Sequence, residues 1–118
     1  MDKEELKRRT KAFAVRVVHM TEALPATRVA DIIARQIIRS ATSVGANYRA
    51  ACRARSHADF ISKMGIVEEE TDETLYWLQL IIEIGLLPEN RLVELVREAD
   101  ELVAIFTSSA RTAKENRA

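Results

Sequence analysis

The sequence predicts an all-α protein, and within that class an antiparallel up-down-up-down four-helix bundle. Apolar residues recur at helical spacing in four long stretches, and no stretch alternates apolar and polar residues as a strand does. Both prolines fall between these stretches, where they end the helices. The links between the stretches are short, so helices that follow one another in sequence should run antiparallel. With 118 residues, 47% of them hydrophobic, the chain predicts one domain over residues 1–118 with a single core.

The first helix is expected over residues 3–23. Its apolar stripe comprises Leu6, Phe13, Val17, Met20 and Leu24. Pro25 ends it, because proline cannot continue a helix interior and biases the residue before it away from helical geometry.

The second helix is expected to begin after Thr27, a suitable N-cap, and to end before a short connection at residues 54–55. One face carries Val29, Ile33, Ile37, Ala41, Val44, Tyr48 and Ala51. Ile32 and Ile38 lie off that face, so the helix is apolar over a wide arc. A wide arc indicates burial on two sides, either by a second helix of the bundle or by another subunit.

The third helix is expected over about 57–84, with Ser56 as its cap and Gly85 just past its end. Its stripe comprises Phe60, Met64, Val67, Thr71, Leu75, Leu78 and Ile82. Pro88 should lie near the first turn of the fourth helix. That helix carries Leu92, Leu95, Val96, Ala99, Leu102, Val103 and Phe106 and should fray beyond about Lys114. We expect the core to include Phe13, Ile37, Leu78 and Leu102.

The second helix contains an unusual run, RSATSVGANYR at residues 39–49, which is rich in poor helix formers. Small side chains allow a neighbouring backbone to approach closely. The run therefore indicates either a tightly packed core helix or a helix that packs on one side and meets a partner on the other. Asn47 needs hydrogen-bond partners near that packing. Glu73 of the third helix either belongs to a solvated acidic face or pairs with Arg39 or Asn47 in a buried network.

Charge is segregated along the chain although the formal net charge is zero. Residues 27–58 carry six arginines against one aspartate, and residues 59–84 carry seven carboxylates against one lysine. Such segregation can join helices, join subunits or make opposed surface patches. The charged N-terminus and the lack of a run of about 20 apolar residues predict a soluble, cytoplasmic protein without a membrane span.

Three segments together resemble a known family: RSATSV-x-AN at residues 39–47, S-x-x-DF at 56–60, and K-x-GIVE-x-E-x-DETLYWL at 63–78. This bacterial four-helix-bundle family has founding members encoded in intervening sequences of large-subunit ribosomal RNA genes. The resemblance covers about residues 10–108 and implies a homopentameric ring. Relatives include the accessory subunit of diversity-generating retroelements, a basic ring that binds nucleic acid and a reverse transcriptase. This chain differs from those subunits in being neutral overall.

The sequence does not predict an enzyme, a cofactor or a metal site. Neither His19 nor His57 belongs to a Glu-x-x-His motif of a di-iron bundle, and neither has the upstream arginine of helical ribonucleases. Cys52 lies five residues before His57, a poor spacing for a catalytic pair on a helix, so a buried or interfacial thiol is expected. A single cysteine excludes an internal disulfide and a cysteine-based zinc site. We expect His57 to be exposed in the first turn of the third helix.

Two functions remain open: an RNA-binding or ribonucleoprotein-binding ring, and a scaffold or adaptor that binds only protein. The candidate nucleic-acid-binding residues are Lys7, Arg8, Lys11, Arg16, Arg49, Arg53 and Arg55. In an antiparallel pair the end of the second helix returns beside the start of the first, so Lys7, Lys11, Arg53 and Arg55 should gather at one end of the bundle. Tyr76 and Trp77 are the candidate subunit contacts, although core burial remains the alternative for Trp77.

Overall fold

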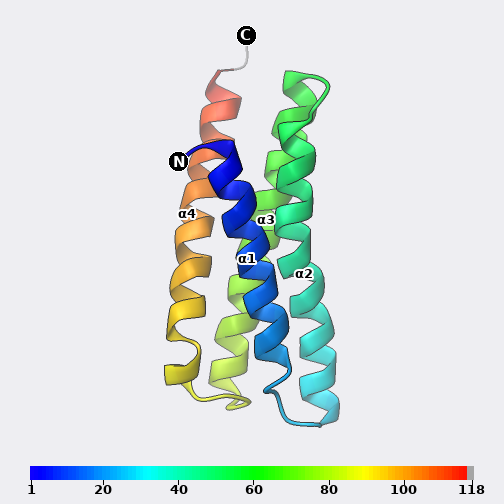
Figure 1. The fold of residues 1–118 in the computed structure, drawn as a ribbon, viewed down its shortest axis with the longest axis vertical. Coiled ribbons are helices and arrows are strands. Elements are labelled where there is room, and N and C mark those ends of the chain that lie inside the picture. The colour runs from blue at the N-terminus through cyan, green and yellow to red at the C-terminus, as the bar shows by residue number, and fades with distance from the viewer. Residues whose placement is uncertain (117–118) are drawn as a thin grey trace.

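The computed structural model describes residues 1–116 and confirms the all-α prediction. Within that range there are four α-helices, α1 (Lys3–Thr21), α2 (Arg28–Cys52), α3 (His57–Glu83) and α4 (Val93–Glu115), and one 3-10 turn, η1 (Glu89–Arg91). Each helix runs antiparallel to its neighbour in sequence, in a bundle of 50 × 21 × 21 Å (Figure 1). The predicted domain, 1–118, extends over residues 117–118, which lie outside the described residues.

Short polar side chains fix the helix starts. The Thr27 and Ser56 side chains accept hydrogen bonds from the backbone N–H groups of Ala30 and Asp59, at 3.2 and 3.0 Å, as the sequence predicted. Gly85 has a φ of 76° and closes the end of α3, where its N–H donates to the Ile82 carbonyl. Glycine adopts this left-handed conformation without the penalty that a β-carbon brings.

Two predicted boundaries differ from the structure. Helix α1 ends at Thr21 and not at residue 23, because the chain leaves through a turn that begins at Glu22. Pro88 does not lie in the first turn of α4. It precedes η1, and α4 begins at Val93 after the Leu92 N–H has bonded to the Glu89 carbonyl.

The core runs along the axis of the bundle and includes all four residues chosen from the sequence. Phe13, Ile37, Leu78 and Leu102 are at most 1% exposed. The prediction for Val29 is wrong, because this side chain is 52% exposed and Ala30 is buried in its place. Ala30 faces the link between α1 and α2 and lines a surface cavity there with Leu24 and Thr27.

Helix α4 stays packed almost to its end. Its buried stripe continues beyond Phe106 through Ala110 and Ala113, and the helix ends at Glu115. Helix α1 is the shortest of the four. The last residues of α2, the first residues of α3 and the turn between them therefore extend beyond the first residue of α1 (Figure 1). No helix among residues 1–116 is long and apolar enough to cross a membrane.

Candidate nucleic-acid interface

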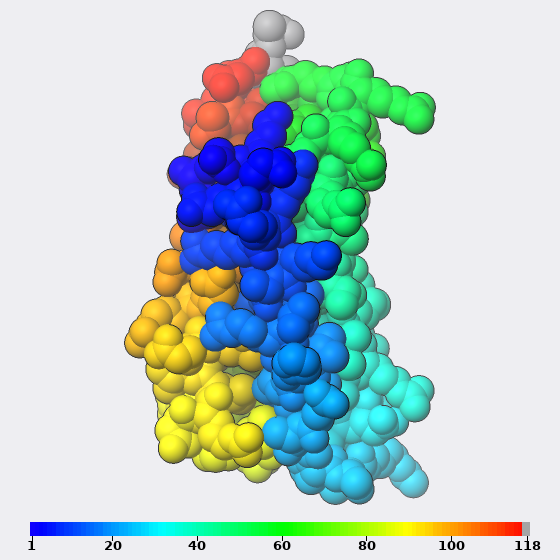
Figure 2. Space-filling model, in the orientation of Figure 1, coloured from blue at the N-terminus to red at the C-terminus, as the bar shows by residue number. Residues whose placement is uncertain are grey.

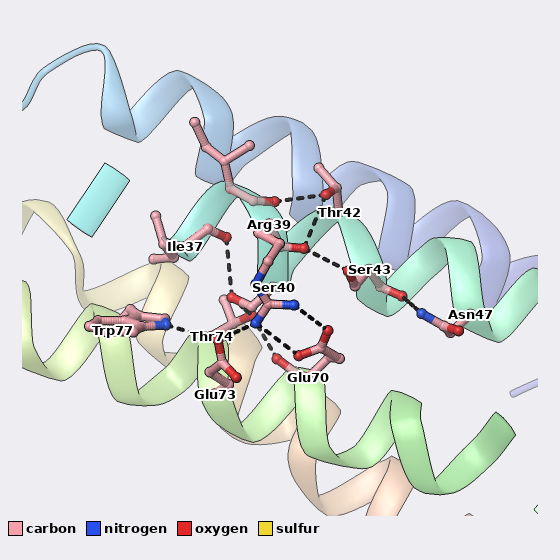
Figure 3. Close-up of polar contacts among 11 residues, drawn as sticks. Ile37, Arg39, Ser40, Thr42, Ser43, Asn47, Glu70, Glu73, Thr74 and Trp77 are labelled. Carbon is pink, nitrogen blue, oxygen red and sulfur yellow. Dashed lines mark hydrogen bonds and ion pairs between the residues drawn. The ribbon is translucent and has the colours of Figure 1, made fainter. Parts of the chain in front are cut away.

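Small residues of α2 lie at two contacts between helices, one with α3 and one with α1. We call these contacts the α2–α3 seam and the α1–α2 seam. On the α3 side Ser40 is fully buried, and its hydroxyl accepts a hydrogen bond of 2.8 Å from the Thr74 hydroxyl (Figure 3). On the α1 side a β-carbon added to Gly45 would lie 3.2 Å from the Thr10 hydroxyl oxygen. The small side chains at 39–49 therefore allow α2 to pack closely against both neighbouring helices.

At the α2–α3 seam the arginine is neutralised. The Arg39 guanidinium donates to Glu70 at 2.8 and 3.3 Å and also to Glu73, which in turn accepts from the Trp77 indole N–H at 3.2 Å (Figure 3). Hydrogen bonds to Glu70 and then to Glu73 raise the pKa of Arg39. Arg39 is half exposed, so the predicted Glu73–Arg39 pair exists, but its burial was wrong. Asn47 stays apart and donates to the Ser43 carbonyl.

The α1–α2 seam carries the opposite arrangement, a groove of about 180 Å³ with a basic rim. Its lining residues are Lys7, Thr10, Lys11, Ala14, Thr42, Gly45, Ala46 and Arg49. None of these eight described residues is a carboxylate. Lys7 pairs with Glu4 at 3.0 Å, whereas within residues 1–116 neither Lys11 nor Arg49 forms an ion pair. Figure 2 shows the face on which α1 lies beside α2.

A second basic groove, of about 540 Å³, lies where α2 turns into α3. It is lined by Ala50, Arg53, Arg55, Asp59 and Lys63. Asp59 accepts from the Lys63 ammonium at 2.8 Å and from the Arg55 backbone N–H at 3.3 Å, and these contacts hold the pKa of Asp59 below its usual value. The side chains of Arg53 and Arg55 are exposed.

The two grooves are neighbours on α2, because Arg53 follows Arg49 by one helical turn. We use the name basic track for Lys7, Lys11, Arg49, Arg53 and Arg55. The four residues expected to gather at one end of the bundle are divided between two grooves: Lys7 and Lys11 line the first, and Arg53 and Arg55 line the second. The sequence did not single out Arg49 for this cluster or Lys63 for the second groove, because Lys63 is the one cation of an acidic stretch.

The other two candidate cations do not belong to the basic track. Arg16 lines a different cavity, of about 340 Å³, with His19 and Arg91 between the end of α1 and the start of α4. Arg8 is exposed on α1 and follows Lys7 directly, so it lies about 100° round the helix from Lys7.

Arg9 is a charged contact that the sequence did not reveal. It bridges α1 to α4 by donating to Glu98 at 2.7 Å through two nitrogens and to Glu101 at 2.8 Å. Its side chain is only 20% exposed, and the hydrogen bond to Glu98 is the main reason that the pKa of Arg9 is raised. Nothing in the spacing along α1 distinguishes Arg9 from Arg8, because the carboxylates that bind it come from 89 and 92 residues away.

The two candidate subunit contacts differ in burial. Tyr76 is 55% exposed, while Trp77 is half-buried against the core, and their rings meet edge to face at 5.1 Å. Other large apolar side chains are also exposed. They include Val29, Ile32, Ile66, Ile84 and Val93.

His57 and Cys52 have structural surroundings. The His57 ring is exposed, as predicted, and its Nε2 lies 2.9 Å from the Ala113 carbonyl, which ties the start of α3 to the end of α4. Cys52 is partly buried one turn after Tyr48, whose pKa is raised, mainly by burial. Residues 1–116 contain no group of three or more His, Cys, Asp or Glu side chains placed to hold a metal ion.

The chain is similar to one known protein family and to a solved structure. The model of the family described as 23S rRNA-intervening sequence protein matches residues 3–108. A solved structure from Bacteroides thetaiotaomicron VPI-5482, described as a protein with unknown function from the S23 ribosomal protein family, is 33% identical with a TM-score of 0.85. The alignment covers 94% of this chain and 99% of that one. No curated protein matched.

Proposed function

The chain belongs to the 23S rRNA-intervening sequence protein family, and on that premise we propose that it is a non-catalytic assembly protein that binds RNA through the basic track. The observation that carries this proposal is the groove between α1 and α2, where Lys7, Lys11 and Arg49 surround small side chains and no lining residue is acidic. Lysine and arginine side chains in such a place attract and hold phosphates.

The formal net charge of zero does not argue against this function. Ten of the eighteen carboxylates lie in the acidic stretch 68–73 and on α4, where Glu70, Glu73, Glu98 and Glu101 are engaged with Arg39 and Arg9. Glu4, which pairs with Lys7, and Asp59 of the second groove lie at the track itself. The α1–α2 groove itself is lined by three cations and by no carboxylate, which favours an anion there. Contacts to phosphate carry no base information, so binding should tolerate changes of sequence and weaken steeply with salt.

We further propose that the protein assembles as a homopentameric ring, which is what the family resemblance implies. Exposed apolar side chains on α2, α3 and α4, among them Ile32, Tyr76 and Val93, support a subunit contact. A heterologous contact, in which one surface meets a different surface of the next subunit, gives a ring when its rotation closes, and a ring would repeat the basic track around one rim. Tyr76 and Trp77 remain our candidates for that contact, and a reverse-transcriptase-type protein remains a candidate partner besides RNA.

The test is RNA binding by the double variant Lys11→Ala/Arg49→Ala. Each lost phosphate contact should lower the slope of log affinity against log salt by about 1, so we expect a slope about 2 smaller and markedly weaker binding at low salt. The matched control is Arg28→Ala/Arg35→Ala at the other end of α2, which removes the same charge and should bind like the unmodified protein. Light scattering should report about five chains for all three proteins. Unchanged affinity and slope in the first variant would refute the groove as an RNA site.

The exposed apolar side chains also favour a second candidate, a scaffold or adaptor that binds only protein. Tyr76 at 55% exposure is of the residue type enriched at the centre of protein interfaces. In that case the protein would bind no RNA even at low salt, while Tyr76→Ala would weaken assembly or partner binding.

A further inference from the structure

The shape and composition of the basic track indicate which form of RNA it takes. Proteins bind single strands by stacking bases on aromatic side chains, whereas double-stranded RNA is recognised through its phosphates, its 2′-hydroxyls and its shape. The side chains that line the two grooves therefore distinguish these classes.

All six aromatic residues of the chain lie away from the grooves. Phe13, Tyr48 and Phe106 are buried. Tyr76 and Trp77 lie beside Glu73 at the α2–α3 seam, and Phe60 lies beside His57, 6.5 Å from it between ring centres. Among the described residues, neither groove lining includes an aromatic ring.

The α1–α2 groove is also small. Its volume of about 180 Å³ is below the roughly 300 Å³ of pockets that bury a drug-sized ligand, whereas the second groove, of about 540 Å³, is wider. Thr10 and Gly45 both line the α1–α2 groove, and a β-carbon added to Gly45 would lie 3.2 Å from the Thr10 hydroxyl oxygen, so α1 and α2 are closely spaced there. A phosphate can sit at the mouth of this groove between Lys7, Lys11 and Arg49, while the base points away from the protein.

The basic track leads to a projecting end of the bundle. On α2 the track begins at Arg49, and Arg53 follows about 6 Å further along the helix axis at 1.5 Å per residue. The track ends on the α2–α3 turn, which extends beyond the first residue of α1 (Figure 1).

We infer that the basic track binds the phosphate backbone of double-stranded RNA and does not read or stack unpaired bases. This inference rests on the proposed function, because it specifies the substrate of the same site. It names the ligand by its chemistry, a rigid row of phosphates, and assigns no base preference.

The experiment compares three RNAs of equal length by fluorescence anisotropy over a range of salt: a duplex of about 20 base pairs, oligo-U and oligo-A. We expect the duplex to bind several-fold more tightly, with a slope of log affinity against log salt of about −4 to −5 for five neutralised phosphates. Permuting the duplex sequence should leave its affinity unchanged. The variant Arg53→Ala/Arg55→Ala should reduce the duplex slope by about 2, and Arg28→Ala/Arg35→Ala should not.

The possible failures are distinguishable. If either oligo-U or oligo-A binds more tightly than the duplex, the inference is wrong, although the protein still binds RNA. Absence of binding to all three RNAs at low salt would overturn the proposed function as well. A duplex that binds equally well after both pairs of track residues are replaced would show that the track is not the site.

Discussion

On one side α2 packs against α3 and on the other against α1, and in both places small residues let the backbones approach. Ser40 meets Thr74 across the first seam, and Gly45 meets Thr10 across the second. Arginines lie at the surface of both seams. The difference is that Arg39 is bound by two carboxylates of α3, whereas Arg49 forms no ion pair within the described residues and lines a groove without carboxylates.

This difference separates two uses of the same residue type. An arginine between two carboxylates has its donors occupied and holds two helices in register, so it offers little to a ligand. An arginine beside lysines repels them, and that repulsion is relieved when an anion binds. The acidic stretch of α3 therefore has a structural partner on α2, and the basic track is the surface that we propose for phosphate.

The largest expected effect comes from placing a bulky side chain between α2 and α3. Ser40→Leu should lower the free energy of unfolding by about 2–3 kcal/mol, because it overpacks a fully buried position and removes the hydrogen bond from Thr74. Gln36→Leu, on an exposed position of the same helix, should stay within about 0.5 kcal/mol. Urea unfolding measures both, and similar values for the two variants would mean that the α2–α3 seam is not tightly packed.

A smaller effect should distinguish the α1–α2 seam from an open helix surface. Gly65→Ala in α3 should stabilise the protein by about 0.5–1 kcal/mol, since nothing lies within 4 Å of the added carbon and alanine favours the helix. Gly45→Ala should gain less or lose stability, because the Thr10 hydroxyl lies 3.2 Å from the new carbon and is held by a hydrogen bond to the Leu6 carbonyl. Equal gains in urea unfolding would contradict the close approach.

Much of the fold could be predicted from the sequence because it depends on local signals. Helical spacing, the caps Thr27 and Ser56, and Gly85 at the end of α3 act within a few residues of where they occur. Val29 was wrongly assigned to the buried face. The apolar stripe further along α2 does not determine which of two adjacent residues in the first turn is buried against the link between α1 and α2. The start of α4 was misjudged because Pro88 is compatible with either a 3-10 turn or an α-helix.

The candidate site was predicted only in part, since charge pairing depends on residues distant in sequence. Antiparallel topology was enough to bring Lys7 and Lys11 near the end of α2. It could not show that Arg39 would be occupied by α3, that Arg9 would be occupied by α4, or that Arg16 would face a different cavity. Those outcomes depend on the rotation of each helix about its axis, which the charged positions alone do not determine.

The central claim is that Arg39 is structural and Arg49 binds RNA, and the most direct test is to replace each with alanine. Urea unfolding and the affinity for a 20-base-pair RNA duplex would be measured for both variants at the same salt concentration. We predict that Arg39→Ala lowers the unfolding free energy by up to about 1 kcal/mol, an exposed pair being weak, and leaves RNA affinity unchanged. Arg49→Ala should leave stability within about 0.5 kcal/mol and weaken RNA binding, with a salt slope smaller by about 1. Equal losses of RNA affinity in the two variants would contradict the claim, because binding would then follow overall charge and not the open groove.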